Sequence, residues 1–156
     1  MLKGAGFTAR QLKEEGYSIE QLKEAGFKPG ALQREGRFQL PDLKAAGFTA
    51  AQFKADGFGP GELKQAGFSL QEIRQVGFQA KQLGLKAGFT LHQLRVAGFP
   101  AMEVKTIGGV TPEMMLEAGF SKSQVSGAFS KAELSGDKPV SVKPTNVSDA
   151  AALLKD

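Results

Sequence analysis

The sequence predicts an all-α protein, an α-solenoid of about fourteen short helices of about seven residues each, arranged in ten-residue repeats. A Leu-like position recurs along the chain, and nine of its thirteen spacings are ten residues. Glycine and an aromatic residue follow most of these positions, and a fixed short period of this kind indicates a repeat architecture. The Leu-like positions are Leu2, Leu12, Leu22, Leu32, Leu43, Phe53, Leu63, Ile73, Leu83, Leu94, Val104, Met115, Val125 and Leu134.

Residues 67–78 show why each repeat predicts one helix. Ser69 can cap a helix start, and Glu72 three residues later completes a capping box. Gly77 can adopt the left-handed conformation after the last turn, and Phe78 supplies the apolar residue of a Schellman motif. The pattern predicts a helix over residues 70–76.

The aromatic residue between two helices is predicted to join them. Phe68 follows one helix end and precedes the next helix start, so the hydrophobic staple places it against Ile73, and the Schellman contact brings Phe78 back to the same residue. A helix of seven residues is far below the ~12–15 residues that give marginal stability alone, so the repeats must stack. A single continuous helix is disfavoured, because a glycine in every repeat would cost roughly 1 kcal/mol each time.

A second period of about 20 residues predicts that the helices pair as helical hairpins, which form the stacking layers. Acidic residues precede the glycine at alternate repeats, and strong capping residues also fall at alternate repeats. The acids are Glu15, Glu35 and Asp56, and the capping residues are Thr49, Ser69, Thr90 and Thr111. The extra residue within 36–38, 83–88 and 107–110 predicts lengthened turns or bulged helix ends.

Two regions are predicted: a repeat solenoid over residues 1–134 and an extended tail over 135–156, made of a linker and a short C-terminal helix. That helix either folds back to cap the array or attaches to a partner through Leu153 and Leu154. The first repeat has no capping residue of its own, so its helix either frays or continues a longer array.

Composition argues against most catalytic chemistry. The chain has no cysteine, which excludes disulfides and thiolate catalysis, and its single histidine, His92, makes neither a triad nor a typical metal site. The recurring carboxylates fall on successive layers and do not converge on one cavity, and no glycine belongs to a phosphate-binding loop. We therefore expect no enzyme activity, cofactor or metal. No signal peptide or membrane span is visible, and an intracellular or organellar location is expected, with the compartment undetermined.

A series of basic residues, here called the basic column, follows the Leu-like position in most repeats. One interpretation is a charged ladder for nucleic acid, anionic lipid or an acidic protein. The other is structural: basic residues near a helix C-terminus complement the helix dipole and keep the array soluble. Interleaved glutamates and the absence of an alternating exposed aromatic series favour the structural interpretation. The column consists of Lys3, Lys13, Lys23, Lys44, Lys54, Lys64, Arg74, Arg95 and Lys105.

The repeat Gly-Phe-Thr/Ser-x-x-Gln/Glu-Leu-Lys-x-Ala resembles the tandem Ala-Gly-Phe decapeptide repeats of many microbial proteins, over residues 2–134. This resemblance implies an architecture of short-helix repeats and no particular activity. Residues 67–73 are also similar to helix starts in TAL-effector-like DNA-binding repeats and in mitochondrial transcription termination factors. The DNA-reading residues of those repeats have no counterpart in this sequence.

The predicted function is a non-catalytic scaffold, linker or protein-interaction module that is a subunit of a larger assembly. The alternative is a repeat-type nucleic-acid binder that uses the basic column. A designed or consensus array fits poorly with the irregular repeats and the tail.

Overall fold

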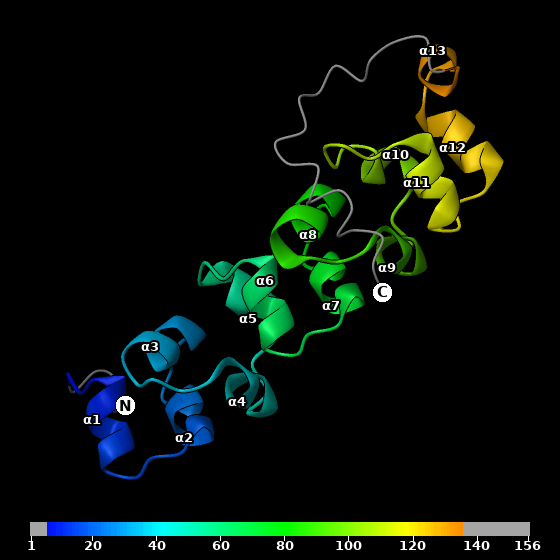
Figure 1. Cartoon of the computed structure of the whole chain (residues 1–156). Helices are drawn as coiled ribbons and strands as arrows, with labels where there is room; N and C mark the ends of the chain where they lie inside the picture. The colour runs from blue at the N-terminus through cyan, green and yellow to red at the C-terminus, as the bar shows by residue number, and fades with distance from the viewer. Residues whose placement is uncertain (1–5, 136–156) are drawn as a thin grey trace. The chain divides into compact units, whose positions relative to one another are not determined.

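The structure, a computed structural model, describes residues 6–135 and is built there from thirteen short helices (Figure 1). Each helix contains one Leu-like residue, and the first such residue, Leu2, lies outside the described residues. The predicted all-α repeat architecture is confirmed. The helices are α1 (Ala9–Glu14), α2 (Ile19–Glu24), α3 (Pro29–Arg34), α4 (Leu40–Ala45), α5 (Ala50–Ala55), α6 (Pro60–Gln65), α7 (Leu70–Gln75), α8 (Ala80–Ala87), α9 (Leu91–Val96), α10 (Ala101–Val104), α11 (Pro112–Glu117), α12 (Lys122–Ala128) and α13 (Lys131–Leu134).

Most helices have six residues, one fewer than predicted, because the residue before the glycine is the C-cap and lies outside the helix. In α7 this residue is Val76, with φ −82° and ψ 8°. The start of α7 has the predicted capping box: Glu72 N–H donates to the Ser69 hydroxyl at 3.2 Å, and Ser69 N–H donates to the Glu72 carboxylate at 2.7 Å. Two orphan N–H groups at the helix start are thereby satisfied.

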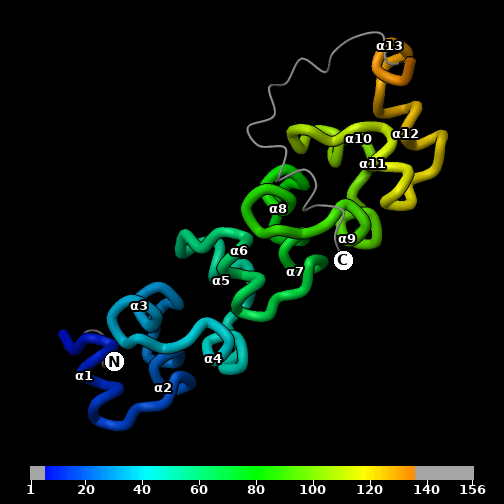
Figure 2. The backbone as a smooth tube through the Cα atoms, in the orientation of Figure 1, coloured from blue at the N-terminus to red at the C-terminus, as the bar shows by residue number. Residues whose placement is uncertain are grey.

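Schellman motifs end α1, α2, α4, α5, α6, α9 and α11, as predicted. At the end of α2, Phe27 N–H donates to the Leu22 carbonyl at 3.0 Å, and Gly26 N–H donates to the Lys23 carbonyl at 2.9 Å. Gly26 has φ 88°, which an L-residue adopts only with strain. In these helices the left-handed glycine turns the chain out of the helix, and the trace in Figure 2 changes direction at these junctions.

Leu-like side chains and most junction aromatics form the core. Ile73 is fully buried and Phe68 is 5% exposed. Phe53, at a Leu-like position, lies 5.2 Å from the ring of Phe58, which is the contact expected within a Schellman motif, and 5.2 Å from the ring of Phe68. The prediction that the junction aromatics are buried is confirmed for most repeats, while Phe7 remains 49% exposed.

Helices stack on their second neighbours along the chain, which confirms the two-helix layer. The chain divides into two compact units, Met1–Val76 and Gly77–Asp156. In the first unit α1 contacts α3, α3 contacts α5, and α4 contacts α6. In the second unit α8 contacts α10, and α10 contacts α12.

The irregular repeats change helix ends in the way that the sequence predicts. α8 extends to eight residues and ends at the left-handed Gly88, and α10 has four residues with Gly109 at φ 83° in the loop that follows. After α3 the left-handed position falls on Arg37, with φ 51°, because Gly36 comes one residue too early.

We expect Arg37→Gly to raise the free energy of unfolding by about 0.5–1 kcal/mol, because a non-glycine residue in the left-handed region costs about 1–2 kcal/mol and the added freedom of glycine in the unfolded chain offsets part of this. Denaturant unfolding measures the effect. Gly36→Ala is the opposite control: its Cβ would lie 2.8 Å from the Leu32 carbonyl and from the Phe38 ring, so it must destabilise.

The predicted tail lies almost entirely outside the described residues. The linker, the C-terminal helix and the candidate attachment residues Leu153 and Leu154 all fall within 136–156. The predicted boundary after residue 134 and the role of the tail therefore stay predictions.

Candidate functional site

The basic column lies at the C-terminal ends of the helices, one residue after the buried Leu-like side chain. In α1, α2, α4, α5, α6, α7 and α9 the basic residue occupies the last turn, and Lys105 is the residue that ends α10. Lys3 lies outside the described residues. This placement follows from the repeat. The buried Leu-like residue lies near the end of each short helix, so the basic residue that follows it falls in the last turn.

Basic side chains of the column bond to the backbone of the helix two repeats further on. Lys23 Nζ donates to the carbonyls of Gly47 at 2.7 Å and Ala46 at 3.0 Å, where α4 ends. These bonds, here called inter-layer bonds, recur in both units of the chain. They join Lys13 to Gly36 at 2.8 Å, Lys44 to Gly67 at 2.5 Å, Lys54 to Val76, Arg95 Nε to Ala118 at 2.9 Å, and Lys105 to Ala128 at 3.1 Å.

The same ammonium groups lie over the aromatic residue of the neighbouring junction. Lys44 Nζ is 4.6 Å from the centroid of the Phe68 ring, and Lys13 Nζ is 4.2 Å from that of Phe38. Lys23 over Phe48 and Lys105 over Phe129 repeat the arrangement at 5.2 and 4.7 Å. A cation within about 6 Å of a ring face is attracted to the ring quadrupole.

Each inter-layer bond brings a positive charge to the negative end of a helix. The last carbonyls of a helix have no partner within the helix, and the helix dipole places partial negative charge there. A single lysine satisfies such a carbonyl, complements the dipole and covers an aromatic face. The column therefore has a structural role, as the favoured interpretation of the sequence holds. Its contact with a helix end 22 to 24 residues further along the chain was not part of that interpretation.

One column position in the first unit carries no cation, which offers a test of the inter-layer bond. Gln33 stands where Lys would reach the end of α5 at Asp56 and Gly57, and the space above Gly57 is open. We expect Gln33→Lys to raise the free energy of unfolding by about 0.5–1 kcal/mol, and Gln33→Met, which has similar bulk and no charge, to give no such gain. Thermal unfolding of the two variants makes the comparison.

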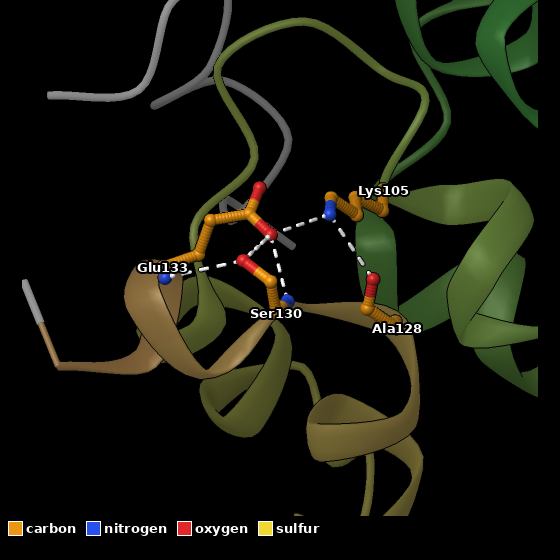
Figure 3. Close-up of polar contacts among 4 residues, drawn as sticks. All are labelled: Lys105, Ala128, Ser130 and Glu133. Atoms are coloured by element: carbon orange, nitrogen blue, oxygen red, sulfur yellow. Dashed lines mark hydrogen bonds and ion pairs between the residues drawn. The ribbon is translucent and has the colours of Figure 1, made fainter. Parts of the chain in front are cut away.

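The last inter-layer bond extends into an ion pair with α13 (Figure 3). Lys105 Nζ donates to the Ala128 carbonyl and to the Glu133 carboxylate at 2.9 Å. The same carboxylate accepts from the Ser130 N–H at 2.7 Å and from the Ser130 hydroxyl at 2.8 Å. The hydrogen bond from Lys105, followed by those from Ser130, lowers the pKa of Glu133 to about 2.

This pKa makes the attachment of α13 sensitive to acid. The pKa is depressed from its ordinary value of 4.5, so the stabilising contribution is complete above pH 4.5 and is lost as the pH falls towards 2. We expect an NMR titration of the Glu133 side-chain carboxyl to give a pKa near 2, and Lys105→Gln to raise it towards 4.5. An unchanged pKa in that variant would contradict the ion pair.

Two acidic side chains cap helix starts that have no side-chain cap of their own. The Asp56 carboxylate accepts from Gly30 N–H in α3, whose N-cap residue is Lys28. The Glu103 carboxylate accepts from Ala80 N–H at 2.9 Å, where α8 starts. At these two helix starts an acid from another layer satisfies an N–H group.

Other residues singled out in the sequence lie apart from one another. His92 is exposed on α9, and Glu15 and Glu35 are exposed at the ends of α1 and α3. Within residues 6–135, no group of three or more His, Cys, Asp or Glu side chains could hold a metal ion, and no helix is long and apolar enough to cross a bilayer.

These features define a class: a stack of short helices in decapeptide repeats, held by buried aliphatic and aromatic side chains and by bonds between layers. A family model described as "Decapeptide repeat region" matches residues 33–85, which confirms the resemblance predicted from the repeat. Searches of curated proteins and of solved structures found no match.

Proposed function

We propose that this chain is a non-catalytic scaffold or protein-interaction module, a subunit of a larger assembly. The observation that supports the proposal most is the structural use of the recurring charged groups. Basic side chains cap helix ends in the next layer, and acidic side chains cap helix starts. Here the recurring charged side chains hold the layers at a fixed spacing. Stacked repeats of this kind present an extended binding surface, which favours an interaction role over catalysis.

The second unit of the chain offers exposed apolar side chains to a protein partner. Val96 is 62% exposed and Met102 is 58% exposed, on α9 and α10. Apolar side chains and Met are typical of protein–protein contact surfaces. A partner surface here would leave the inter-layer bonds intact.

Affinity purification from the native source, with mass spectrometry, tests the proposal. We expect a stoichiometric protein partner, and we expect Val96→Ser combined with Met102→Ser to reduce its recovery more than the control Leu85→Ser, another exposed apolar residue. Turnover of any substrate in a broad panel by the purified chain would contradict the non-catalytic role.

Nucleic-acid binding by the basic column stays the alternative. A shift assay with random-sequence DNA and RNA separates the two functions, because release of counterions makes such binding strongest at low salt. Absence of a shift at low salt would remove the alternative. Binding that declines steeply with salt would favour it over the scaffold.

A further inference from the structure

Two arginines depart from the repeat pattern at the junction between α3 and α4. Arg37 has φ 51°, and every other residue with a left-handed φ in the described part of the chain is glycine. Arg34 stands two residues after Leu32, and no other repeat has a basic residue at the equivalent position. Backbone strain and departures from a local rule concentrate at functional sites. This junction is therefore the first place to look for a binding site.

Both arginines line one hollow in the first unit of the chain. The hollow has a volume of about 410 Å³, and its lining also includes three amide side chains, those of Gln33, Gln39 and Gln65. Among residues 6–135, no acidic residue lines it. Two guanidinium groups and three amides without a carboxylate suit an oxyanion, because a guanidinium fork matches two oxygens of such a group.

The guanidinium groups keep donors free for a ligand. Arg34 Nε donates to the Gly30 carbonyl at 3.2 Å, and this bond orients the side chain from within α3. The Arg37 side chain makes no hydrogen bond or ion pair with the described residues, and both arginines are exposed. A bound oxyanion would therefore add hydrogen bonds without breaking any that the fold uses at Arg37.

We propose that this hollow, here called the α3–α4 site, binds a carboxylate side chain in an acidic segment of a partner protein. Phe38 also lines the hollow and is half-buried, whereas Phe48 at the next junction is 3% exposed. The Phe38 ring thus offers apolar surface to the methylene groups that carry the carboxylate. This assignment rests on the proposed interaction function and names the partner's chemistry.

A nucleic-acid backbone fits this part of the surface less well, because both signs of charge lie beside the hollow. Arg37 also lines a second hollow, and the lining of that hollow includes Glu14 and Glu35. A strand with a phosphate at every nucleotide would meet these carboxylates as it continued past Arg37. A peptide can place one carboxylate in the hollow and neutral residues beside Glu14 and Glu35.

The test is an NMR titration of the full 156-residue chain with a synthetic acidic peptide, Gly-Glu-Glu-Leu-Glu-Glu-Gly. The control peptide has glutamine in place of each glutamate. We expect the acidic peptide to shift backbone resonances of residues 33–40 and the Nε–H resonances of Arg34 and Arg37, and the control peptide to leave them in place. Equal shifts with the two peptides, shifts centred elsewhere, or no binding of the acidic peptide would each overturn the proposal.

A single-stranded DNA oligonucleotide with the same net charge as the acidic peptide tests the class of partner. We expect the DNA to bind more weakly than the peptide at residues 33–40, because of the neighbouring carboxylates. Tighter binding of the DNA at these residues would overturn the assignment to a protein partner in favour of nucleic acid.

Arg37→Gly separates binding from folding, because the same change is expected to stabilise the chain. We expect it to weaken binding of the acidic peptide about fivefold, the effect of one well-oriented exposed ion pair. Lys28→Met removes an exposed positive charge outside this hollow and is expected to leave the affinity unchanged. Unchanged affinity in Arg37→Gly, or equal weakening by the two variants, would overturn the site.

The proposed function and the α3–α4 site can fail separately. If affinity purification recovers a partner whose binding is unaffected by Arg37→Gly, the site fails and the interaction function stands. If the acidic peptide binds at residues 33–40 while no partner is recovered, the site stands and the interaction function fails.

Discussion

Replacing Phe53 with alanine is expected to lower the free energy of unfolding by about 3–5 kcal/mol. Phe53 is fully buried at the Leu-like position of α5, and its ring contacts the rings of Phe58 and Phe68. The change leaves a cavity beside the rings of Phe58 and Phe68. Denaturant unfolding followed by circular dichroism measures the loss.

Phe53→Leu is the matched control, because leucine occupies the equivalent position in most other repeats. It removes the ring contacts and keeps the aliphatic packing, so we expect a cost of about 1–1.5 kcal/mol. Similar costs for the two substitutions would contradict the assignment of Phe53 to the centre of the stack.

Replacing Lys44 with methionine is expected to destabilise the chain by about 1–2 kcal/mol, through loss of a helix-dipole contribution and a cation–π contribution. Lys44 Nζ donates to the Gly67 carbonyl, lies over the Phe68 ring and is 3.5 Å from the Glu72 carboxylate. Methionine keeps most of the side-chain bulk, so packing alone changes little. Denaturant midpoints at low and high salt measure the effect.

Lys28→Met provides the comparison for this lysine. Lys28 is exposed at the N-cap of α3, where a positive charge opposes the helix dipole, and it makes no side-chain cap bond there. Removing its charge is expected to be neutral or slightly stabilising. If Lys44→Met and Lys28→Met changed the free energy of unfolding equally, the inter-layer bond of Lys44 would make no specific contribution to stability.

The sequence was sufficient to predict features that are set within one or two repeats. Ser69, Glu72 and Gly77 carry the chemistry of a helix start and a helix end, and these signals depend on neighbours three to six residues away. The two-helix layer was also predictable, because the alternating caps repeat every 20 residues. Helix length was overestimated by one residue, since Val76, placed in the helix by the pattern, is the C-cap and has ψ 8°.

The partners of the basic column were not predictable in the same way. The position of Lys23 at a helix end indicates a role with the dipole of its own helix, yet its ammonium reaches the end of α4 instead. That contact depends on how layers stack, which a single repeat does not encode. The left-handed Arg37 was also missed, because the pattern placed glycine one residue earlier.

The most direct test of the inter-layer bonds is NMR of the lysine ammonium groups and their neighbouring methylene protons in the full chain. These bonds predict slow exchange of the Lys23 and Lys44 ammonium protons, a coupling from Lys23 Nζ to the Gly47 carbonyl carbon, and upfield ring-current shifts of the Lys44 ε-methylene protons near Phe68. Random-coil shifts and rapid exchange at both lysines would show that these side chains extend into water, and the layers would then lack the charged bonds that join them.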